Sequence, residues 1–512
     1  MDQLVPLFVI IPLAAAFLIP VIGKFLDGFQ KALSSVVFLF LSVLAVYFVC
    51  SGLTTPIAYA IGGWSPVEGI PIAIYLVADG LSIFILLIIN VIAFLVSLYA
   101  ISYLKRFTAH NNFYALFCLM IAGMNGVVLT GDLFNLYVFM EIAVIASYAL
   151  VAFGIEKNEL EASFKYQVLG GIASVLILFA IALIYWKTKT LNIADAGRIL
   201  QSSQDHPFAV FTQLFLIAGF GLKAALIPFH AWLPDAHSSA PSPISAMLSG
   251  VLIKAIGIYA IIRLFFNMFT LSHEIAVVIT TLGVISMVLG SLLAINQWDI
   301  KRMLAFSSIS QVGYIILGVG MGMIILSRNG DTRVAALAIS GGLFHMINHA
   351  AFKGLLFLNA GAIEHGTSTR NMKELGGLSR IMPVTASTSL SASLAISGIP
   401  PFNGFFSKLI IIIAAIQGQF YLLAALAVLV SIITLAYFMK FQKFTFFHRP
   451  EPLQKTKIKE VPFAMCFSMV VLALLCLGLS LLIFPGIRET ILDPAVRVIM
   501  NSAEYALSIT SI

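Results

Sequence analysis

Long apolar runs and short polar connections alternate along the whole chain. Each run holds about 20 residues, the length an α-helix needs to cross about 30 Å of hydrocarbon. The pattern predicts an all-α integral membrane protein with about fourteen transmembrane helices, which we number in chain order. The expected spans lie at roughly 4–22, 33–50, 81–101, 112–130, 133–153, 166–186, 209–231, 242–265, 274–295, 303–327, 334–363, 384–416, 420–439 and 461–485.

The amino-acid composition agrees with a lipid environment. Of the 512 residues, 60% are hydrophobic and only 10% are charged, whereas soluble domains contain about 25% charged residues. The net charge of +7 does not indicate a nucleic-acid partner, because the basic residues lie in loops beside apolar spans. The four cysteines are isolated and form no CxxC motif. We therefore expect no iron–sulfur or structural zinc site, and no cofactor.

Basic residues divide unevenly between the two sets of connections. An even number of spans places both termini on one side of the membrane. If that side is the outside, the inner connections hold most lysines and arginines, including Lys301 and the 440–459 segment. The outer connections hold fewer, Arg263 and Arg333 among them. Since inner loops carry the excess of Lys and Arg, we expect both termini outside, in the cytoplasmic membrane of a prokaryote.

Five ionisable residues lie inside apolar spans: Glu141, Lys223, Lys254, Lys353 and Lys408. Each such side chain costs about 2.5–3.5 kcal/mol at bilayer depth on insertion scales, so it needs a partner or water. Snorkelling to the interface is an alternative that suits Lys353 best. One carboxylate cannot pair with four lysines. Some of these lysines must therefore lie in a wet interior or lose their proton part of the time, which a proton relay requires.

His345, His349 and Lys353 follow one another at intervals of four residues, so they share one face of the eleventh helix. A zinc pair is one interpretation, but no third cysteine or acidic ligand lies nearby, and we expect no metal. A second interpretation is a pair of core histidines that donate to backbone carbonyls. We favour a hydrogen-bonded proton pathway, because the lysine lies on the same stripe.

Prolines interrupt two spans close to a buried lysine. Lys223 precedes Pro228 in the seventh span, and Pro400 and Pro401 precede Lys408 in the twelfth. Proline breaks the helical hydrogen-bond ladder, and paired breaks in two halves of a chain indicate an inverted-repeat transporter. We expect repeats over 112–265 and 274–443, preceded by a three-helix segment, 1–111. The fourteenth span, 461–485, and a tail, 486–512, follow.

Five long motifs, in order, resemble the antiporter-like subunits shared by respiratory complex I, group 4 membrane-bound hydrogenases and Mrp-type sodium/proton antiporters. They are GDLFNLYVFMEI at 131–142, LKAALIPFHAWLPDAHSSAPSPISAMLSGVLIKAIGIYAIIRLF at 222–265, QWDIKRMLAFSSISQVGY at 297–314, FHMINHAAFKGLLFLNAGAI at 344–363 and SGIPPFNGFFSK at 397–408. The resemblance covers spans four to thirteen, which is most of the chain.

The resemblance implies fourteen core helices in two inverted five-helix repeats, with broken helices seven and twelve. It also implies that the polar residues of the motifs form the ion path. Glu141 matches the acidic partner on helix five, Lys223 and Lys254 match the lysines of helices seven and eight, His345 and His349 match the polar positions of helix eleven, and Lys408 matches the terminal residue of helix twelve. That last residue is glutamate in one complex I subunit, and lysine in the other members.

The motifs also bear on the subfamily. HMINHAAFKGLLFL is more similar to the hydrogenase and complex I members than to typical Mrp antiporters. No long lateral helix is expected after residue 485, which argues against the largest antiporter-like subunit of complex I. We therefore expect a hydrogenase-like or complex I-like complex, with an Mrp-type antiporter as the alternative.

The resulting prediction is a proton-translocating or sodium/proton-translocating subunit without a redox centre or catalytic residues of its own, working with other membrane subunits. Opening and closing of the Glu141–Lys223 pair would send a proton to Lys254, then along the helix-eleven face to Lys408. A stand-alone carrier of an organic solute is a more distant alternative, but the polar chain runs across several helices instead of gathering in one pocket. A subunit that binds quinone or metal directly is disfavoured by the isolated cysteines.

Overall fold

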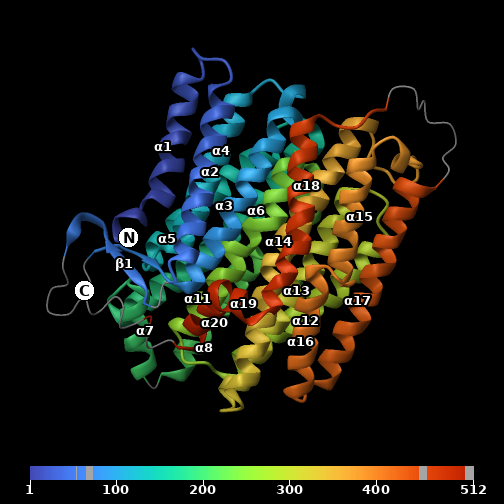
Figure 1. The fold of residues 1–512 in the computed structure, drawn as a ribbon. Coiled ribbons are helices and arrows are strands. Elements are labelled where there is room, and N and C mark those ends of the chain that lie inside the picture. Colours follow the sequence, from blue (N-terminus) through green and yellow to red (C-terminus); the bar gives the residue numbers. More distant parts are fainter. Residues whose placement is uncertain (53–54, 65–72, 204, 449–457, 502–504, 506–512) are drawn as a thin grey trace.

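The computed structural model describes residues 1–512 except 53–54, 65–72, 204, 449–457, 502–504 and 506–512. Helices packed side by side make up nearly the whole of this part of the chain (Figure 1). Twelve of the described helical segments are long and apolar enough to cross a membrane. They contain α1 (Leu7–Ile22), α2 (Phe29–Cys50), α3 (Gly80–Tyr103), α4 (His110–Leu129), α5 (Leu133–Val151), α6 (Lys157–Thr188), α10 and α11 (Ser242–Met247 and Tyr259–Asn267, the eighth span), α12 (His273–Ile295), α13 (Ile300–Ser327), α14 (Thr332–Thr367), α17 (Tyr421–Gln442) and α18 (Phe463–Gly478).

The two spans that remain are the broken ones. The seventh consists of α8 (His206–Lys223) and α9 (Trp232–Ser239), and the twelfth of α15 (Pro383–Ser397) and α16 (Asn403–Gln417). Each break includes the prolines expected to cause it, since proline has no N–H to donate to the preceding turn. The prediction of fourteen spans with breaks in the seventh and twelfth is therefore confirmed.

The sixth helix is longer than its apolar run suggested. It begins at Lys157 instead of near residue 166. There Glu156 and Glu159 form a capping box: the Glu156 side chain accepts the backbone N–H of Glu159, and the Glu159 side chain accepts the backbone N–H of Glu156. This capping stabilises a polar first turn that hydropathy alone assigns to the loop.

Both described ends of the chain lie at the same end of the bundle. A two-stranded antiparallel sheet, β1 (Ile57–Ala60) with β2 (Tyr75–Ala78), joins α2 to α3 and contacts the 2–4 turn. The short helices α19 (Pro485–Ile491) and α20 (Asp493–Met500) pack against α2 and α3 at this end, and α7 (Ile193–Ser202) also lies there (Figure 1). We call it the hairpin face, and the opposite end, which carries Lys105 and Arg302, the basic face.

The two halves of the chain contain the same local structure at the end of a long helix. Where α6 ends, the Thr188 hydroxyl donates to Ile184 O at 2.8 Å and to Thr190 O at 3.1 Å. Where α14 ends, the hydroxyl of Thr367 makes the equivalent bonds at 2.7 and 3.1 Å. In both places the next residue, Lys189 or Ser368, has a φ of 61°.

The segment after each of these helix ends pairs with the start of the preceding span in its own half. Asp132 caps α5 and bridges to Asn192, while Asp299 caps α13 and bridges to Asn371. The two junctions are five spans apart, so they lie at opposite faces of the bundle. This equivalence is what a second half that repeats the first in inverted orientation would contain.

Two basic residues counted as loop charges from the sequence are instead buried. Arg263 lies inside the bundle and donates to both carboxylate oxygens of Asp79, at 2.7 and 2.8 Å. Lys301 is also buried and donates to Ala240 O at 2.7 Å. A buried charge can stay inside because a paired carboxylate or a carbonyl dipole offsets its desolvation. These two residues therefore do not count in the comparison of loop charges, and the predicted orientation rests on the exposed basic residues.

Labelling of single cysteines tests the orientation. Ser511 and Lys455, the most direct positions from the sequence, lie outside the described residues, whereas Lys443 and Glu489 are described and exposed. In a Cys50→Ser background, Lys443→Cys should react with an impermeant maleimide only from the cytoplasm and Glu489→Cys only from outside. Reaction of both cysteines from the same side would contradict the even number of spans, and a swap of sides would reverse the orientation.

Candidate functional site

The first element of the site is an ion pair at the break of the seventh span. Lys223 is the last residue of α8, and its Nζ lies 3.5 Å from Glu141 Oε1 on α5. Ser174 of α6 joins the two, since Lys223 Nζ donates to its hydroxyl at 3.0 Å and the hydroxyl donates to Glu141 Oε1 at 2.5 Å. The pair expected from the sequence thus lies within ion-pair range, and the bridging serine is a residue that the sequence analysis missed.

Side chains satisfy part of the backbone that the break exposes. The indole N–H of Trp232 donates to Leu222 O at 2.9 Å, and Ile227 N donates to the Ser286 hydroxyl at 2.9 Å. Gly257 of the eighth span packs so closely that a Cβ there would lie 2.7 Å from the backbone nitrogen of Ala224. The absence of a side chain at Gly257 brings the eighth span against the residue next to Lys223.

Lys254 lies in an irregular part of the eighth span. The helix widens into π-type turns at Leu248–Leu252 and Lys254–Ile258. Lys254 is buried, and its Nζ donates to the carbonyls of Ser249 and Gly250 at 2.6 and 2.7 Å. π-turns are rare and concentrate at functional sites. Here the irregular turn supplies the acceptors for a lysine that has no carboxylate partner among the described residues.

The polar face of α14 is fully buried. His345 lies between the Ser407 hydroxyl at 3.0 Å and Gln311 Oε1 at 3.1 Å. The ring of His349 is parallel to that of His345, with centroids 6.5 Å apart, and neither of its nitrogens has a hydrogen-bond partner. Lys353 completes the face and donates to Leu304 O at 2.7 Å.

These contacts bear on the interpretations of the α14 face. Lys353 has no exposed surface, so it does not snorkel to the interface. His345 bonds to side chains, so the pair of histidines that donate to backbone carbonyls is not what the structure contains. Among the described residues no three His, Cys, Asp or Glu side chains gather as metal ligands would.

Lys408, the last of the ionisable residues expected from the sequence, lies at the break of the twelfth span. Its Nζ donates at 2.8 Å to Ile396 O, a carbonyl at the end of α15, and lies 4.9 Å from the centre of the Tyr314 ring. Ser407, the preceding residue, is the one that bonds His345. The helix break therefore supplies the acceptor for the lysine and also fixes the lysine next to the α14 face.

His237 is a further buried titratable residue that the sequence analysis did not single out. It lies on α9 with no exposed surface, and both ring nitrogens are without a hydrogen-bond partner. Its ring centre is 5.9 Å from that of Trp232 and 6.0 Å from that of Phe357, and Lys254 and Lys353 act on it electrostatically. The only signal in the sequence was that His237 lies just after the predicted seventh span, 209–231. His230, at the edge of that span, is partly exposed.

Comparison with known proteins assigns the chain that carries these residues to a family. A family model described as "NADH:quinone oxidoreductase/Mrp antiporter, TM" matches residues 130–434, which include every site residue expected from the sequence. The chain belongs to this family. A second model, "NADH-Ubiquinone oxidoreductase (complex I), chain 5 N-terminus", matches residues 64–114.

Individual relatives cover nearly the whole chain. It is 33% identical to NADH-quinone oxidoreductase subunit N of Desulforudis audaxviator, over 98% of this chain and 97% of that protein. It is 35% identical to Na(+)/H(+) antiporter subunit A1 of Staphylococcus aureus, over 96% of this chain but only 63% of that protein.

Two solved structures share the fold over almost their full length. A chain of the Mrp complex from Dietzia sp. superposes with a TM-score of 0.90 at 25% identity, covering 99% of both chains. A chain of the membrane-bound sulfane sulfur reductase, an archaeal respiratory membrane complex, superposes with a TM-score of 0.85 at 29% identity, covering 99% of this chain and 100% of that one. This protein is thus a multi-pass, ion-translocating, antiporter-like subunit, and the resemblance seen in its motifs is confirmed.

The bridging role of Ser174 gives a prediction. Ser174→Ala removes the hydroxyl that links Lys223 to Glu141, and a hydrogen bond to a charged group contributes about 1.5–3 kcal/mol. We expect ion transport in proteoliposomes, normalised to assembled protein, to fall about tenfold. Ser163→Ala is the matched control, because that buried α6 hydroxyl donates to Tyr148 O and does not touch the pair. Equal transport by the two variants would show that the bridge has no role.

Proposed function

We propose that this chain carries protons through the row formed by Glu141, Lys223, Lys254, the α14 face and Lys408. The observation that carries the proposal is the nature of the lysine partners. Among the described residues, Lys254, Lys353 and Lys408 are buried and donate to backbone carbonyls, with no carboxylate in ion-pair range. A carbonyl dipole holds an ammonium less firmly than a carboxylate does, so each lysine can release its proton and regain it.

The row consists of groups that can take up and release a proton. Lys223 is the only relay lysine paired with a carboxylate in the described structure, at Glu141. Separation of this pair would leave Lys223 uncompensated in a desolvated site, which favours transfer of its proton toward Lys254. His345 and His349 follow, and a neutral imidazole can accept a proton on one nitrogen and donate from the other. Closure of the pair then resets Lys223.

The spread of these groups favours a relay over a solute-binding site. They lie on α5, α8, the eighth span, α14 and α16, and each makes its own contacts instead of facing one shared pocket. A carrier of organic solutes would bring its polar groups together around the bound molecule. The solute-carrier alternative therefore finds no support in the arrangement.

One part of the row points to a partner subunit. The Glu141 side chain is 23% exposed, and its α5 neighbours Phe134, Val138 and Ile145 are exposed apolar residues. A carboxylate on an apolar surface at bilayer depth is costly in contact with lipid. We therefore propose that another membrane subunit covers this face of α5 and α6 and that its movements control the Glu141–Lys223 pair.

The complex that supplies this partner is proposed from the relatives. They are named as subunits of NADH-quinone oxidoreductase and of a Na(+)/H(+) antiporter. The end-to-end match with subunit N favours an oxidoreductase-type membrane complex, in which redox subunits drive the transport and this chain has no redox centre. An Mrp-type antiporter, driven by the opposing ion gradient, is the alternative, and copurification in mild detergent distinguishes the two. In both cases we place the chain in the cell membrane of a prokaryote with its termini outside.

Replacement of Lys254 by arginine tests the relay. Arginine keeps the positive charge but does not release its proton, because the guanidinium stays protonated in proteins. If Lys254 passes protons, Lys254→Arg should lower proton transport in proteoliposomes at least tenfold, nearly as far as Lys254→Ala. Lys187→Arg serves as the control, since this half-buried lysine outside the row pairs with Asp205 at 2.6 Å. A Lys254→Arg protein that assembles and transports at the wild-type rate would remove Lys254 from the relay.

A further inference from the structure

A buried ion pair fixes the end of the eighth span that lies at the hairpin face. Arg263 of α11 donates to both carboxylate oxygens of Asp79, at 2.7 and 2.8 Å, and neither side chain is more than 2% exposed. Asp79 lies between β2 and α3 and also caps α3, where it accepts from Ser82 N at 2.8 Å. A bidentate pair of guanidinium and carboxylate fixes the orientation of both groups as well as their distance. At this end the eighth span therefore has one defined rotation about its own axis.

Further hydrogen bonds hold α11 in the same place. The Tyr259 hydroxyl donates to Val128 O of α4 at 2.5 Å and accepts from Arg263 Nε at 3.1 Å. One turn beyond Arg263, the Asn267 amide donates to Val498 O of α20 at 3.1 Å. The end of the eighth span is thus tied to α3, α4 and α20, with the Arg263 guanidinium in the middle of these contacts.

The other end of the eighth span, toward the basic face, is fixed as well. The Ser245 hydroxyl of α10 donates to His237 O of α9 at 2.8 Å. One turn further on, the hydroxyls of Ser249 and Ser308 share a hydrogen bond of 2.7 Å, which joins the eighth span to α13. Lys254 therefore lies on a segment of helix whose two ends are both held by other helices.

The irregular turns lie between these fixed ends. Ile253 N donates to Leu248 O, and Tyr259 N donates to Lys254 O, so each bond reaches five residues back instead of four. A turn of this type contains one residue more than a turn of α-helix, and such turns are rare because the α-helical pattern is normally preferred. If one of them relaxed to α-helix, the residues that follow would rotate by about 100° around the helix axis. Arg263 would then point away from Asp79.

We propose that Asp79 and Arg263 are positioning residues for the relay, whose pair keeps the eighth span in the register that gives Lys254 its acceptors. The proposal rests on the proposed function and adds to it two residues that pass no proton themselves. In the present register the Lys254 ammonium donates to Ser249 O and Gly250 O, at 2.6 and 2.7 Å. Without the pair, the 248–258 segment changes between π-type and α-helical turns, and Lys254 is no longer held in one place.

Replacement of Arg263 by lysine tests the positioning role. Lysine keeps the positive charge beside Asp79, but a single ammonium does not fix orientation as the planar guanidinium does. We expect proton transport in proteoliposomes, normalised to assembled protein, to fall at least about fivefold. Amide hydrogen exchange of 248–258, followed by mass spectrometry, should become faster, because local opening of a helix exposes its backbone groups. Exchange in α17, which lies elsewhere in the bundle, should stay as in the wild type.

Arg488→Lys is the matched control. Arg488 of α19 lies at the same face and pairs with Asp493 at 3.1 Å. Its replacement should leave both transport and the exchange of 248–258 unchanged. Tyr259→Phe is a milder second variant, because it removes the hydroxyl that joins Arg263 to Val128 O without any change of charge. It should give the same two changes as Arg263→Lys to a smaller extent, and it decides the matter where Arg263→Lys does not assemble.

The two measurements separate this role from general stabilisation and from the relay itself. If exchange in Arg263→Lys rises equally in 248–258 and α17 while transport per assembled protein is kept, the pair only stabilises the bundle and the positioning role is wrong. If Lys254→Arg loses transport but Arg263→Lys behaves like Arg488→Lys in both measurements, the relay stands without this pair. If Lys254→Arg transports at the wild-type rate, Lys254 leaves the relay, and the pair has no relay residue to position.

Discussion

The cost of a charge inside the bilayer governs the rest of this structure. An unpaired ionisable side chain costs about 2.5–3.5 kcal/mol or more at that depth, and the relay lysines outnumber the single carboxylate among them. For Lys254 and Lys408 the chain meets this cost with irregular backbone. Lys408 donates to Ile396 O next to the break after α15, and Lys254 donates to Ser249 O and Gly250 O in the π-type turn. Irregular backbone, which lipid would penalise, is tolerated because these lysines use its carbonyls.

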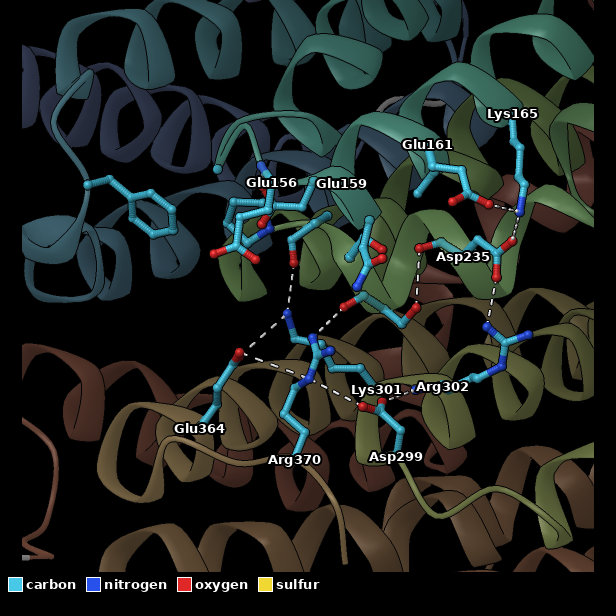
Figure 2. A pocket seen from close by; sticks show the side chains of 18 of the residues that line it. Glu156, Glu159, Glu161, Lys165, Asp235, Asp299, Lys301, Arg302, Glu364 and Arg370 are labelled. Atoms are coloured by element: carbon cyan, nitrogen blue, oxygen red, sulfur yellow. Dashed lines mark hydrogen bonds and ion pairs between the residues drawn. The ribbon is translucent and has the colours of Figure 1, made fainter.

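The two halves place their charged groups differently, although they share local structure. Equivalent junctions, Asp132 with Asn192 and Asp299 with Asn371, lie at opposite faces of the bundle. In the first half, the pair of Glu141 and Lys223 lies near a bundle surface that a partner can cover. In the second half, the junction of Asp299 borders a cavity at the basic face that is lined by charged side chains of both halves (Figure 2).

Much of the fold could be predicted from the sequence, because each membrane span is a continuous apolar run of about the same length. The fourteen spans, the breaks near Pro228 and Pro400, and the buried lysines all follow from that pattern. Helix ends were less predictable: α6 begins at Lys157 because of a capping box, which hydropathy does not register. Arg263 was counted as a loop charge, because hydropathy does not show that it pairs inside the bundle with Asp79, which is 184 positions away in the sequence.

The sequence by itself indicated that Glu141, Lys223, Lys254, Lys353 and Lys408 lie inside membrane spans, because long apolar runs flank each of them. Only the tertiary structure decided what each of them contacts. Ser174 joins Glu141 to Lys223 from a third helix, and Gln311 and Ser407 hold His345 from two others. His237 became notable only when α9 packed with the His237 ring near those of Trp232 and Phe357. Hydrogen bonds and ion pairs act over a few ångströms in space, so residues far apart in the chain become partners only through packing.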